Sequence, residues 1–484
     1  MARWDDEADL LVVGYGGAGA ATAIAGADLG ADVIVCEKQP AERHTPSTKI
    51  GGGALMTVTD ADKAAIYLDR CAAGMVPAEV SRAWAERAAG VMDWVSSVCA
   101  AEYERSIGAE HPEFPGSEAM QSFTSAGHGK ALFGHLADAV SRRPSVQVRF
   151  DSPGSRLVRD DDGRVAGIEI AGPGGARRIR ARQGVVLTCG GYEYADDMKR
   201  NYLKGEPIYF YGNPGNTGDG VRMAQGVGAD LWHMNQMIGR AISHFELPDG
   251  SDLNSLVIIG DLMKPGNPPG YVLTDGQGRR FANEYMQAMS RHDFYYLLLN
   301  YDPATSTFPR IPCYWFFDER RMALGAPVAT ELGPVAHGYY DWSDGSEREI
   351  ERGWISRGAS IEEVAAAAGV ADPEQAAREV SAHNEACRTG SDPFGRPASS
   401  LVPLDWPPYY CMPLYPGGSN TSGGPRRNEY AQVLDVFGAP IPGLYEAGEL
   451  GEPVGLMYPC NGANISDCLC FGQIAAEHAL GKLR

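Results

Sequence analysis

Apolar positions near the N-terminus predict two buried strands joined by a helix. Leu10 to Val13 form a continuous apolar run, which suits a parallel strand covered on both faces. A glycine turn and an alanine-rich stretch follow, and ADVIVCEK, residues 31–38, supplies the second strand. Buried strands that alternate with helices are typical of an α/β fold around a parallel sheet. We therefore expect an α/β domain at the start of the chain.

Later segments repeat this pattern. Residues 162–203 predict hairpin strands, then the apolar strand GVVLTCGGY at 184–192, then a helix. An amphipathic helix is expected after the glycine turn at Asp219. IPGLYEAGELG, residues 441–451, predicts another strand that runs into a glycine turn.

The middle of the chain predicts a mixed region of helices and strands. IPCYWFFDERR, residues 311–321, has the composition of a strand. The segments 360–370 and 372–390 have helical patterns. Ser360 and Asp372 precede acidic residues at the starts of these segments, so we expect both to be N-caps.

The charge of the chain argues against one class of partner. With 42 Lys and Arg against 62 Asp and Glu, the net charge is −20. Binding phosphate backbones needs a surplus of basic residues, so nucleic acid is not an expected partner. The uncharged run from Leu10 to Ala27 follows four acidic residues and contains five glycines, which argues against a signal peptide or a membrane span. We expect a cytoplasmic protein without an integral membrane segment.

The ten cysteines do not predict a metal site. None has the paired CxxC spacing of zinc sites, and the CxC at Cys468 and Cys470 cannot supply a closed tetrahedral site alone. We expect no bound metal. The cysteines are expected to be buried small hydrophobes or free thiols. They are Cys36, Cys71, Cys99, Cys189, Cys313, Cys387, Cys411, Cys460, Cys468 and Cys470.

The first glycine turn has the spacing of a dinucleotide site. Gly14, Gly16 and Gly19 form GxGxxG between a predicted strand and a predicted helix. Gly14 permits the tight turn, Gly16 lets the backbone approach a pyrophosphate, and Gly19 lets the helix pack closely on the strand. Glu37, at the end of the second strand, can accept hydrogen bonds from ribose hydroxyls, and an acid there disfavours a 2′-phosphate. NAD and FAD both fit this motif.

Four later motifs indicate a family. They are TCGG at 188–191, TGDG at 217–220, GLYEAGE at 443–449 and GANISDCLCFGQIAA at 462–476. Together with the glycine turn, their order resembles the flavoprotein superfamily of fumarate reductases, urocanate reductases and 3-ketosteroid dehydrogenases. The resemblance extends over nearly the whole chain and implies FAD as the cofactor.

The resemblance also implies an architecture. We expect a Rossmann-type, glutathione reductase-like FAD-binding domain at 1–245 and 416–484, with an inserted α+β cap or substrate domain at 246–415. The segment 43–53, RHTPSTKIGGG, is expected to be a loop along the ribityl chain and flavin ring. The cofactor-binding candidates are Gly14, Gly16, Gly17, Ala18, Gly19, Glu37, Lys38, Ser47, Thr48, Gly52, Gly53, Gly154, Gly190, Gly191, Asp219, Glu449, Asn464 and Ile465.

The reaction of this family is hydride transfer at flavin N5 coupled to proton transfer at a neighbouring carbon. By resemblance to the proton-shuttling arginine of fumarate reductases, Arg291 is the first candidate for proton transfer, with His292 beside it. The alternative role for Arg291 is a salt bridge between domains. By resemblance to ketosteroid dehydrogenases, Tyr458 is the candidate donor to a substrate carbonyl, and its alternative role is stacking against the flavin.

Two missing residues guide the prediction of the substrate. The loop MYPCNGAN lacks the arginine that fumarate reductases use to clamp a carboxylate, and PLYPGGSN lacks their histidine. The best expectation is therefore a 3-ketosteroid dehydrogenase-like enzyme acting on a bulky apolar ketone, with a role in steroid metabolism. The alternative is a fumarate or urocanate reductase-like enoate reductase with Arg291 as proton donor. Either would need a small-molecule substrate and an unidentified electron donor or acceptor.

Two further expectations concern basic residues. His44 lies ahead of a glycine run, as does the histidine that binds flavin covalently in succinate dehydrogenases, although the spacing differs by one residue. Covalent attachment through His44 therefore stays open. Arg426 and Arg427 are expected to be exposed on a hairpin.

Overall fold

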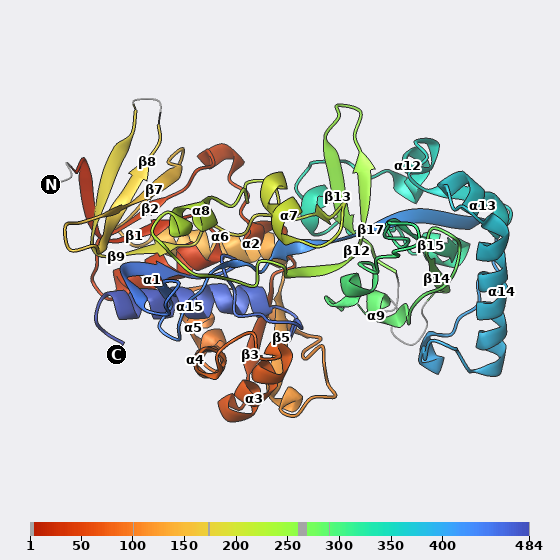
Figure 1. Cartoon of the computed structure of the whole chain (residues 1–484), viewed down its shortest axis with the longest axis horizontal. Helices are drawn as coiled ribbons and strands as arrows, with labels where there is room; N and C mark the ends of the chain where they lie inside the picture. Colours follow the sequence, from red (N-terminus) through yellow and green to blue (C-terminus); the bar gives the residue numbers. More distant parts are fainter. Residues whose placement is uncertain (1–3, 100, 173–174, 260–268, 290, 484) are drawn as a thin grey trace. The chain divides into compact units, whose positions relative to one another are not determined.

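The protein is described here by a computed structural model. The structure describes residues 4–99, 101–172, 175–259, 269–289 and 291–483 (Figure 1). It divides into two compact units, each described by itself. The first unit consists of Met1–Leu203, Gly212–Met237 and Asn420–Arg484, and the second of Lys204–Tyr211 and Ile238–Ser419.

The first unit is built around an eight-stranded sheet. The strand order is β19-β20-β9-β1-β2-β6, and β8 joins β7 to β9 at the side. The pairs β20–β9, β9–β1, β1–β2 and β2–β6 are parallel. The strands are β1 (Asp6–Val13), β2 (Val33–Cys36), β6 (Val146–Arg149), β7 (Gly154–Arg159), β8 (Val165–Ile170), β9 (Arg177–Leu187), β19 (Gln432–Leu434) and β20 (Pro440–Glu446).

Parallel pairing brings the ends of four strands to one edge of this sheet. Leu10 of β1 pairs with Val33 of β2, and Val13 pairs with Cys36. β9 ends at Leu187, so TCGG follows the strand rather than ending it. Ligands of open α/β sheets bind at the carboxyl ends of the strands. The residues just after β1, β2, β9 and β20 are therefore placed to form a binding site.

Helices cover this sheet, and two of them pack closely together. Helix α1 is buried along most of its length and lies beside α15 (Figure 1). Gly472 of α15 permits this approach, because a Cβ there would lie 2.8 Å from the carbonyl oxygen of Ala18. The helices of the first unit are α1 (Gly17–Asp28), α2 (Ser47–Ile50), α3 (Ala61–Ala72), α4 (Ala78–Ala88), α5 (Val91–Val98), α6 (His128–Ser141), α7 (Asp196–Tyr202), α8 (Asp219–Gln225) and α15 (Ala463–Ala479).

Smaller sheets complete the first unit. A three-stranded antiparallel sheet has the order β3-β5-β4, and β11 pairs with β18. Their bounds are β3 (Ala54–Val58), β4 (Tyr103–Ser106), β5 (Met120–Ser125), β11 (Leu231–Trp232) and β18 (Gly424–Pro425). One expectation was wrong here, because Ser47–Ile50 forms the short helix α2 where a loop was predicted.

The second unit contains a seven-stranded sheet. Its main path is β13-β12-β17-β15-β14, and β10 and β16 also pair with β17. Because β10 pairs with β17, residues 204–211 belong to this unit, which is therefore larger than the predicted 246–415. The strands are β10 (Tyr209–Phe210), β12 (Met237–Glu246), β13 (Asp252–Leu256), β14 (Tyr271–Thr274), β15 (Cys313–Asp318), β16 (Ser356–Gly358) and β17 (Tyr409–Thr421).

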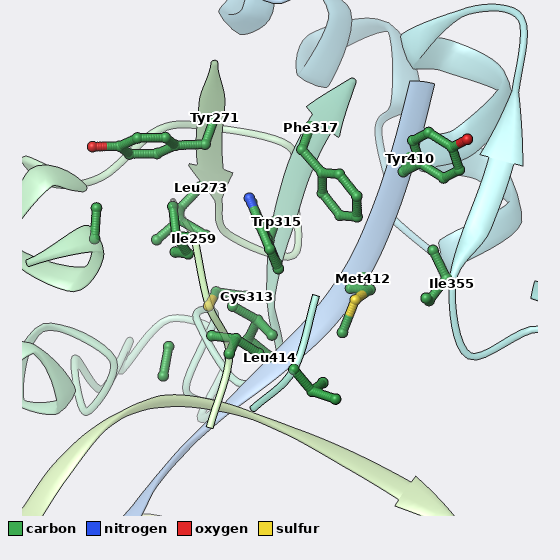
Figure 2. Packing of buried hydrophobic residues seen from close by; sticks show 14 of the residues in the cluster. Ile259, Tyr271, Leu273, Cys313, Trp315, Phe317, Ile355, Tyr410, Met412 and Leu414 are labelled. Carbon is green, nitrogen blue, oxygen red and sulfur yellow. The ribbon is translucent and has the colours of Figure 1, made fainter. Parts of the chain in front are cut away.

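Strand β15 is buried on both faces, which explains its apolar sequence. Cys313, Trp315 and Phe317 point into a cluster with Tyr271 and Met412 (Figure 2). Residues of the opposite face pack against α13 and α14. The helices of this unit are α9 (Tyr285–Ala288), α10 (Glu319–Met322), α11 (Gly333–Ala336), α12 (Glu347–Glu351), α13 (Ile361–Ala368) and α14 (Pro373–Thr389).

The two predicted N-caps are confirmed. The Ser360 hydroxyl accepts a hydrogen bond from the backbone N–H of Glu363, and the Asp372 carboxylate accepts one from that of Gln375. Across the described ranges, no helix is both long enough and apolar enough to cross a bilayer.

Candidate active site

A groove in the first unit lies at the carboxyl ends of β1, β2, β9 and β20. It encloses about 730 Å³ of space not filled by atoms, part of it open to solvent. Many of the predicted cofactor residues line it. These are Gly14, Gly16, Gly17, Ala18, Glu37, Lys38, Ser47, Thr48, Gly154, Gly190, Asp219 and Glu449.

The glycine turn between β1 and α1 forms one side of the groove. Gly14 has φ +105°, and a Cβ there would lie 2.3 Å from the carbonyl oxygen of Thr188. At Gly16 the nearest atom to an added Cβ is Pro46 Cβ at 3.8 Å, which is ordinary van der Waals contact, so the protein itself would tolerate a side-chain atom there. Gly16, the N-cap of α1, provides no side-chain cap, and the N–H of Gly17 donates to the Thr48 hydroxyl at 2.9 Å. The N–H groups at a helix start attract anions. This arrangement fits a dinucleotide pyrophosphate.

Glu37 is held by backbone donors at the end of β2. Its Oε2 accepts from the N–H of Tyr15, and its Oε1 from the N–H of Gln39, each at 2.8 Å. Burial opposes ionisation of Glu37, but these bonds and His44, whose Nε2 is 3.6 Å from Oε2, outweigh it and lower the pKa of Glu37. Each carboxylate oxygen can accept further hydrogen bonds. Glu37 can therefore bind ribose hydroxyls as an ionised acceptor.

His44 is placed by Glu37 and by aromatic rings. It is buried, it does not line the groove, and its ring stacks on Tyr15 with centroids 5.4 Å apart. Phe133 and Phe150 enclose it edge-on. Because its Nε2 faces Glu37, we infer that His44 supports this carboxylate, and the structure gives no support to covalent attachment of flavin.

Lys38 and Asp219 pair with each other at the rim of the groove. The Lys38 ammonium donates to Asp219 Oδ2 at 2.6 Å and to the Thr217 hydroxyl at 2.8 Å. Both side chains are about one-third exposed. The charge of each is thus largely balanced within the protein.

Glu449 follows β20 and lies in the wall of the groove. Asn216 donates from Nδ2 to Glu449 Oε2 at 3.2 Å and to the Ser47 hydroxyl at 3.1 Å. Burial raises the pKa of Glu449, and repulsion from the Glu193 carboxyl raises it further. Asn216 lines the groove, but the sequence analysis missed it because its role depends on partners far away in the chain.

Several predicted cofactor residues do not line the groove. They are Gly19, Gly52, Gly53, Gly191, Asn464 and Ile465. A Cβ at Gly19 would lie 2.1 Å from the carbonyl oxygen of Gly14, which is the close packing that the motif predicts. At Gly53, which has φ +68°, a Cβ would lie 2.4 Å from the carbonyl carbon of His128. These two glycines are required by the fold of the protein itself.

The glycines of TCGG make room for protein side chains. A Cβ at Gly190 would lie 2.6 Å from Asn216 Oδ1, and one at Gly191 would lie 2.2 Å from the Thr421 hydroxyl and 2.4 Å from Glu193 Oε1. Steric demand from Asn216, Thr421 and Glu193 therefore explains the absence of a side chain at both glycines, and Gly190 also lines the groove.

Arg427 is buried, so its predicted exposure was wrong. Its Nη1 donates to Glu446 Oε2 at 3.2 Å, its Nη2 donates to Asp467, and its guanidinium lies 4.0 Å from the centroid of the Phe471 ring. All three ionic side chains are inaccessible to solvent. Arg426, in contrast, is 39% exposed. Arg427 ties the end of β20 to the first turns of α15.

Tyr458 lies in the loop before α15 and is buried. Its hydroxyl accepts a hydrogen bond from the backbone N–H of Asn464 at 3.2 Å, and burial raises its pKa well above the usual value. Asn464 also donates to Asn420 Oδ1 at 2.7 Å, and Asn420 donates to Glu452 Oε1 at 3.1 Å. Tyr458 is therefore a protonated phenol on a fixed network, although it does not line the groove.

Arg291 and His292 belong to the second unit. Arg291 pairs with Asp293 at 2.9 Å, whereas Glu284, seven residues earlier in the sequence, makes a bidentate pair with Arg280. His292 Nε2 contacts the Nη2 of Arg240. An arginine can only donate, so Nε2 of His292 is the acceptor in this contact.

Arg240 was missed in the sequence analysis. It lies on β12 and is 4% exposed. A single arginine within an apolar strand pattern could have raised the question of a buried partner, but nothing local identifies His292 as that partner.

Eight of the ten cysteines are buried, and Cys189 and Cys387 are partly exposed. All ten are free thiols, and Cys468 lines the groove from α15. Burial raises the pKa of Cys468 well above its usual value, which disfavours the reactive thiolate. Among the described residues, no group of three or more His, Cys, Asp and Glu side chains could hold a metal ion.

Comparisons with known proteins agree with a flavin site. A family model described as an FAD binding domain matches residues 9–465. The chain is 28% identical over 384 residues to the 4-oxocyclohexanecarboxylate 2-dehydrogenase of Sinomonas cyclohexanicum, covering 73% of this chain and 61% of that protein. It is 26% identical over 495 residues to the urocanate reductase of Eggerthella lenta, covering 98% and 74%. The chain thus spans about three-fifths of the dehydrogenase that it matches.

A solved structure has a similar fold. The crystal structure of 3-ketosteroid Δ1-dehydrogenase from Sterolibacterium denitrificans, in complex with 1,4-androstadiene-3,17-dione, aligns with a TM-score of 0.83 at 21% identity. The alignment covers 98% of this chain and 100% of that chain. It confirms the fold class predicted from the sequence.

Proposed function

This chain belongs to the FAD-binding flavoprotein family, and from that premise we propose that it is an oxidoreductase that introduces or reduces a C=C bond adjacent to a carbonyl group. FAD, once bound, supplies the centre that accepts or donates hydride. The residues of the chain bind this cofactor, hold the substrate and move a proton. We assign FAD binding to the groove of the first unit.

Three features of the groove would hold FAD. The N–H groups at the start of α1 would bind the pyrophosphate, with Gly16 leaving room for its approach. Glu37 would accept hydrogen bonds from the adenosine ribose. Ser47 and Thr48 of α2 present hydroxyls to the groove, and we assign them to the polar chain between the two halves of the cofactor.

The observation that carries the substrate proposal is the loop 455–462 before α15. It contains Tyr458 and no arginine, so it offers a neutral phenol where a carboxylate clamp would need a cation. A phenol that stays protonated can donate to a carbonyl oxygen as negative charge develops there. We therefore favour a cyclic ketone of the ketosteroid type as the substrate. Relatives named as dehydrogenases of oxo compounds support this choice.

The second candidate function rests on Arg291. Its ion pair with Asp293 could hold the guanidinium in place for proton transfer to an unsaturated acid. The similarity to a urocanate reductase supports this alternative. In that case Arg291 would be the acid of an enoate reductase, and Tyr458 would serve only packing.

An anaerobic flavin titration distinguishes the two functions. The FAD-loaded protein is mixed with a saturated 3-ketosteroid or with 4-oxocyclohexanecarboxylate, and loss of flavin absorbance is followed. We expect a saturated ketone to bleach the flavin. Reoxidation of pre-reduced flavin by urocanate or fumarate, without bleaching by any ketone, would instead establish the enoate reductase. If neither class of compound changes the flavin spectrum, the proposal of C=C chemistry is wrong.

A further inference from the structure

Two carboxyl groups meet beside the groove without a cation. Glu193 is fully buried, and its Oε1 accepts from the N–H of Thr421 at 2.7 Å and from the Thr421 hydroxyl at 3.1 Å. Its Oε2 has no hydrogen-bond partner among the described residues. Glu449 lines the groove. The Asn216 amide donates a hydrogen bond to Glu449, and it also favours the ionised form of Glu193.

The chain is shaped around this pair. Gly190 and Gly191 lack the side chains that would collide with Asn216 and with Glu193. Two adjacent glycines, a bridging amide and two donors from Thr421 come from three separate segments of the chain. Because three segments supply these contacts, the backbone and its neighbours hold the two carboxyl groups in defined positions.

The charged surroundings of the pair are mostly negative. Asp467 and Glu452 are buried nearby, and each of them repels a negative charge on Glu449. The neighbouring Arg427 is engaged by Glu446 and Asp467. Of the basic residues near the groove, Lys38 is paired with Asp219, and His44 lies beside Glu37. No described cation lies within ion-pair distance of Glu193 or Glu449.

A second negative charge on this wall would therefore be strongly opposed. Burial raises the pKa of Glu193, and burial together with the charge of Glu193 raises that of Glu449. Two coupled carboxyl groups lose their protons in two steps that belong to the pair. Over a range of pH the pair holds one proton and carries one negative charge.

We propose that Glu193 and Glu449 form a proton-holding pair that couples cofactor binding to proton uptake. FAD brings a doubly charged pyrophosphate and a hydroxyl-rich chain into the groove. A protonated Glu449 can donate to a ribityl hydroxyl, and it removes one negative charge from the wall. The incoming anion therefore favours the protonated pair, and the required proton comes from solvent. This inference concerns FAD binding and is independent of the substrate.

The sign of the effect follows from linkage. Bound FAD raises the proton affinity of the pair, so the complex holds more protons than the apoprotein at alkaline pH. Affinity for FAD then falls as pH rises through the titration of the pair. One linked proton limits the fall to about tenfold per pH unit.

The test is a titration of apoprotein with FAD between about pH 6 and pH 9, followed by flavin fluorescence. The wild-type affinity should fall at alkaline pH, and Glu193→Gln should flatten this dependence because the amide keeps an acceptor for Thr421 but cannot titrate. Asp219→Asn is the matched control, since this groove acid is paired with Lys38, and it should keep the alkaline fall. A Glu193→Gln profile as steep as that of the wild type would overturn the proposal.

A second measurement needs no variant. Calorimetric titration of wild-type apoprotein with FAD, in buffers of different ionisation enthalpy, counts the protons taken up on binding. In the alkaline pH range where the affinity for FAD falls, we expect the uptake to approach one proton per FAD bound. Zero uptake across the whole range would also overturn the proposal, even if Glu193→Gln failed to fold.

Discussion

Replacing Arg427 with methionine should destabilise the first unit strongly. The guanidinium is the buried cation between Glu446 and Asp467, and it lies against the ring of Phe471. Methionine can keep the packing on the ring but not the charge. Removing one partner of a buried ion pair costs about 3–5 kcal/mol, because the remaining charge is left without compensation. For a unit of this size, that corresponds to a fall in unfolding midpoint on the order of 10 °C.

The cost should depend on pH in a defined direction. Burial raises the pKa of Asp467 to about 6, even though Arg427 lowers it, and burial raises that of Glu446 well above its usual value. A carboxyl group whose folded pKa exceeds its unfolded pKa loses stability as pH rises between the two values. Without Arg427 both folded pKa values rise, so this loss continues to higher pH. The difference in unfolding free energy between the wild type and Arg427→Met should therefore grow with rising pH, by up to about 1.4 kcal/mol per pH unit for each carboxyl group.

The assay is thermal unfolding of the apoprotein at mildly acidic and at alkaline pH, followed by circular dichroism. Arg426→Met is the matched control, because this neighbouring arginine is 39% exposed and lies 3.5 Å from Asp230 at the surface. It should change the stability by less than about 1 kcal/mol. The double variant Arg427→Met with Asp467→Asn should recover part of the loss and reduce its pH dependence. If Arg427→Met unfolds with the midpoint of Arg426→Met at every pH, the reasoning about the buried cluster is refuted.

Four shorter predictions concern the groove and the candidate catalytic residues. Tyr458→Phe should lower turnover by about tenfold or more while FAD stays bound, and unchanged steady-state rates would remove this hydroxyl from the mechanism. Arg291→Ala should abolish turnover, whereas full activity would leave this residue only its ion pair. Gly16→Ala should weaken FAD binding without lowering the unfolding midpoint, because the nearest protein atom to the added Cβ is 3.8 Å away; Gly19→Ala, with an added Cβ 2.1 Å from a backbone oxygen, should lower the midpoint. Acid denaturation should release all of the flavin into the supernatant, and colour retained in the pellet would show a covalent link such as one through His44.

Local patterns were sufficient to predict the features of the fold and the site that neighbouring residues determine. The turn after β1 needs a glycine at 19 because the carbonyl oxygen of Gly14 lies where a Cβ would be, and the GxGxxG motif predicts this close approach. The caps at Ser360 and Asp372 are equally local, since each accepts from the N–H three residues later. In these cases the physical cause and the sequence signal lie within the same short segment.

Other features have causes that lie far away in the sequence. Gly190 and Gly191 were predicted to bind the cofactor because the motif resembles a flavoprotein, and the structure adds a steric reason for both glycines in Asn216 and Thr421. Arg427 looked like an exposed hairpin residue, since its partners lie 19 and 40 positions further along the chain. Residue type and spacing carry no information about such long-range burial.

The groove shows how an acidic protein can bind an anionic cofactor. The negative charge of each acid that lines the groove is compensated in a different way. Glu37 stays ionised because backbone N–H groups and His44 compensate it. Asp219 is compensated by Lys38. Glu449 has neither kind of partner, and beside Glu193 a proton is the remaining means of compensation. This compensation is a proton taken up from solvent, so the alkaline limit of cofactor binding should follow the Glu193 and Glu449 pair.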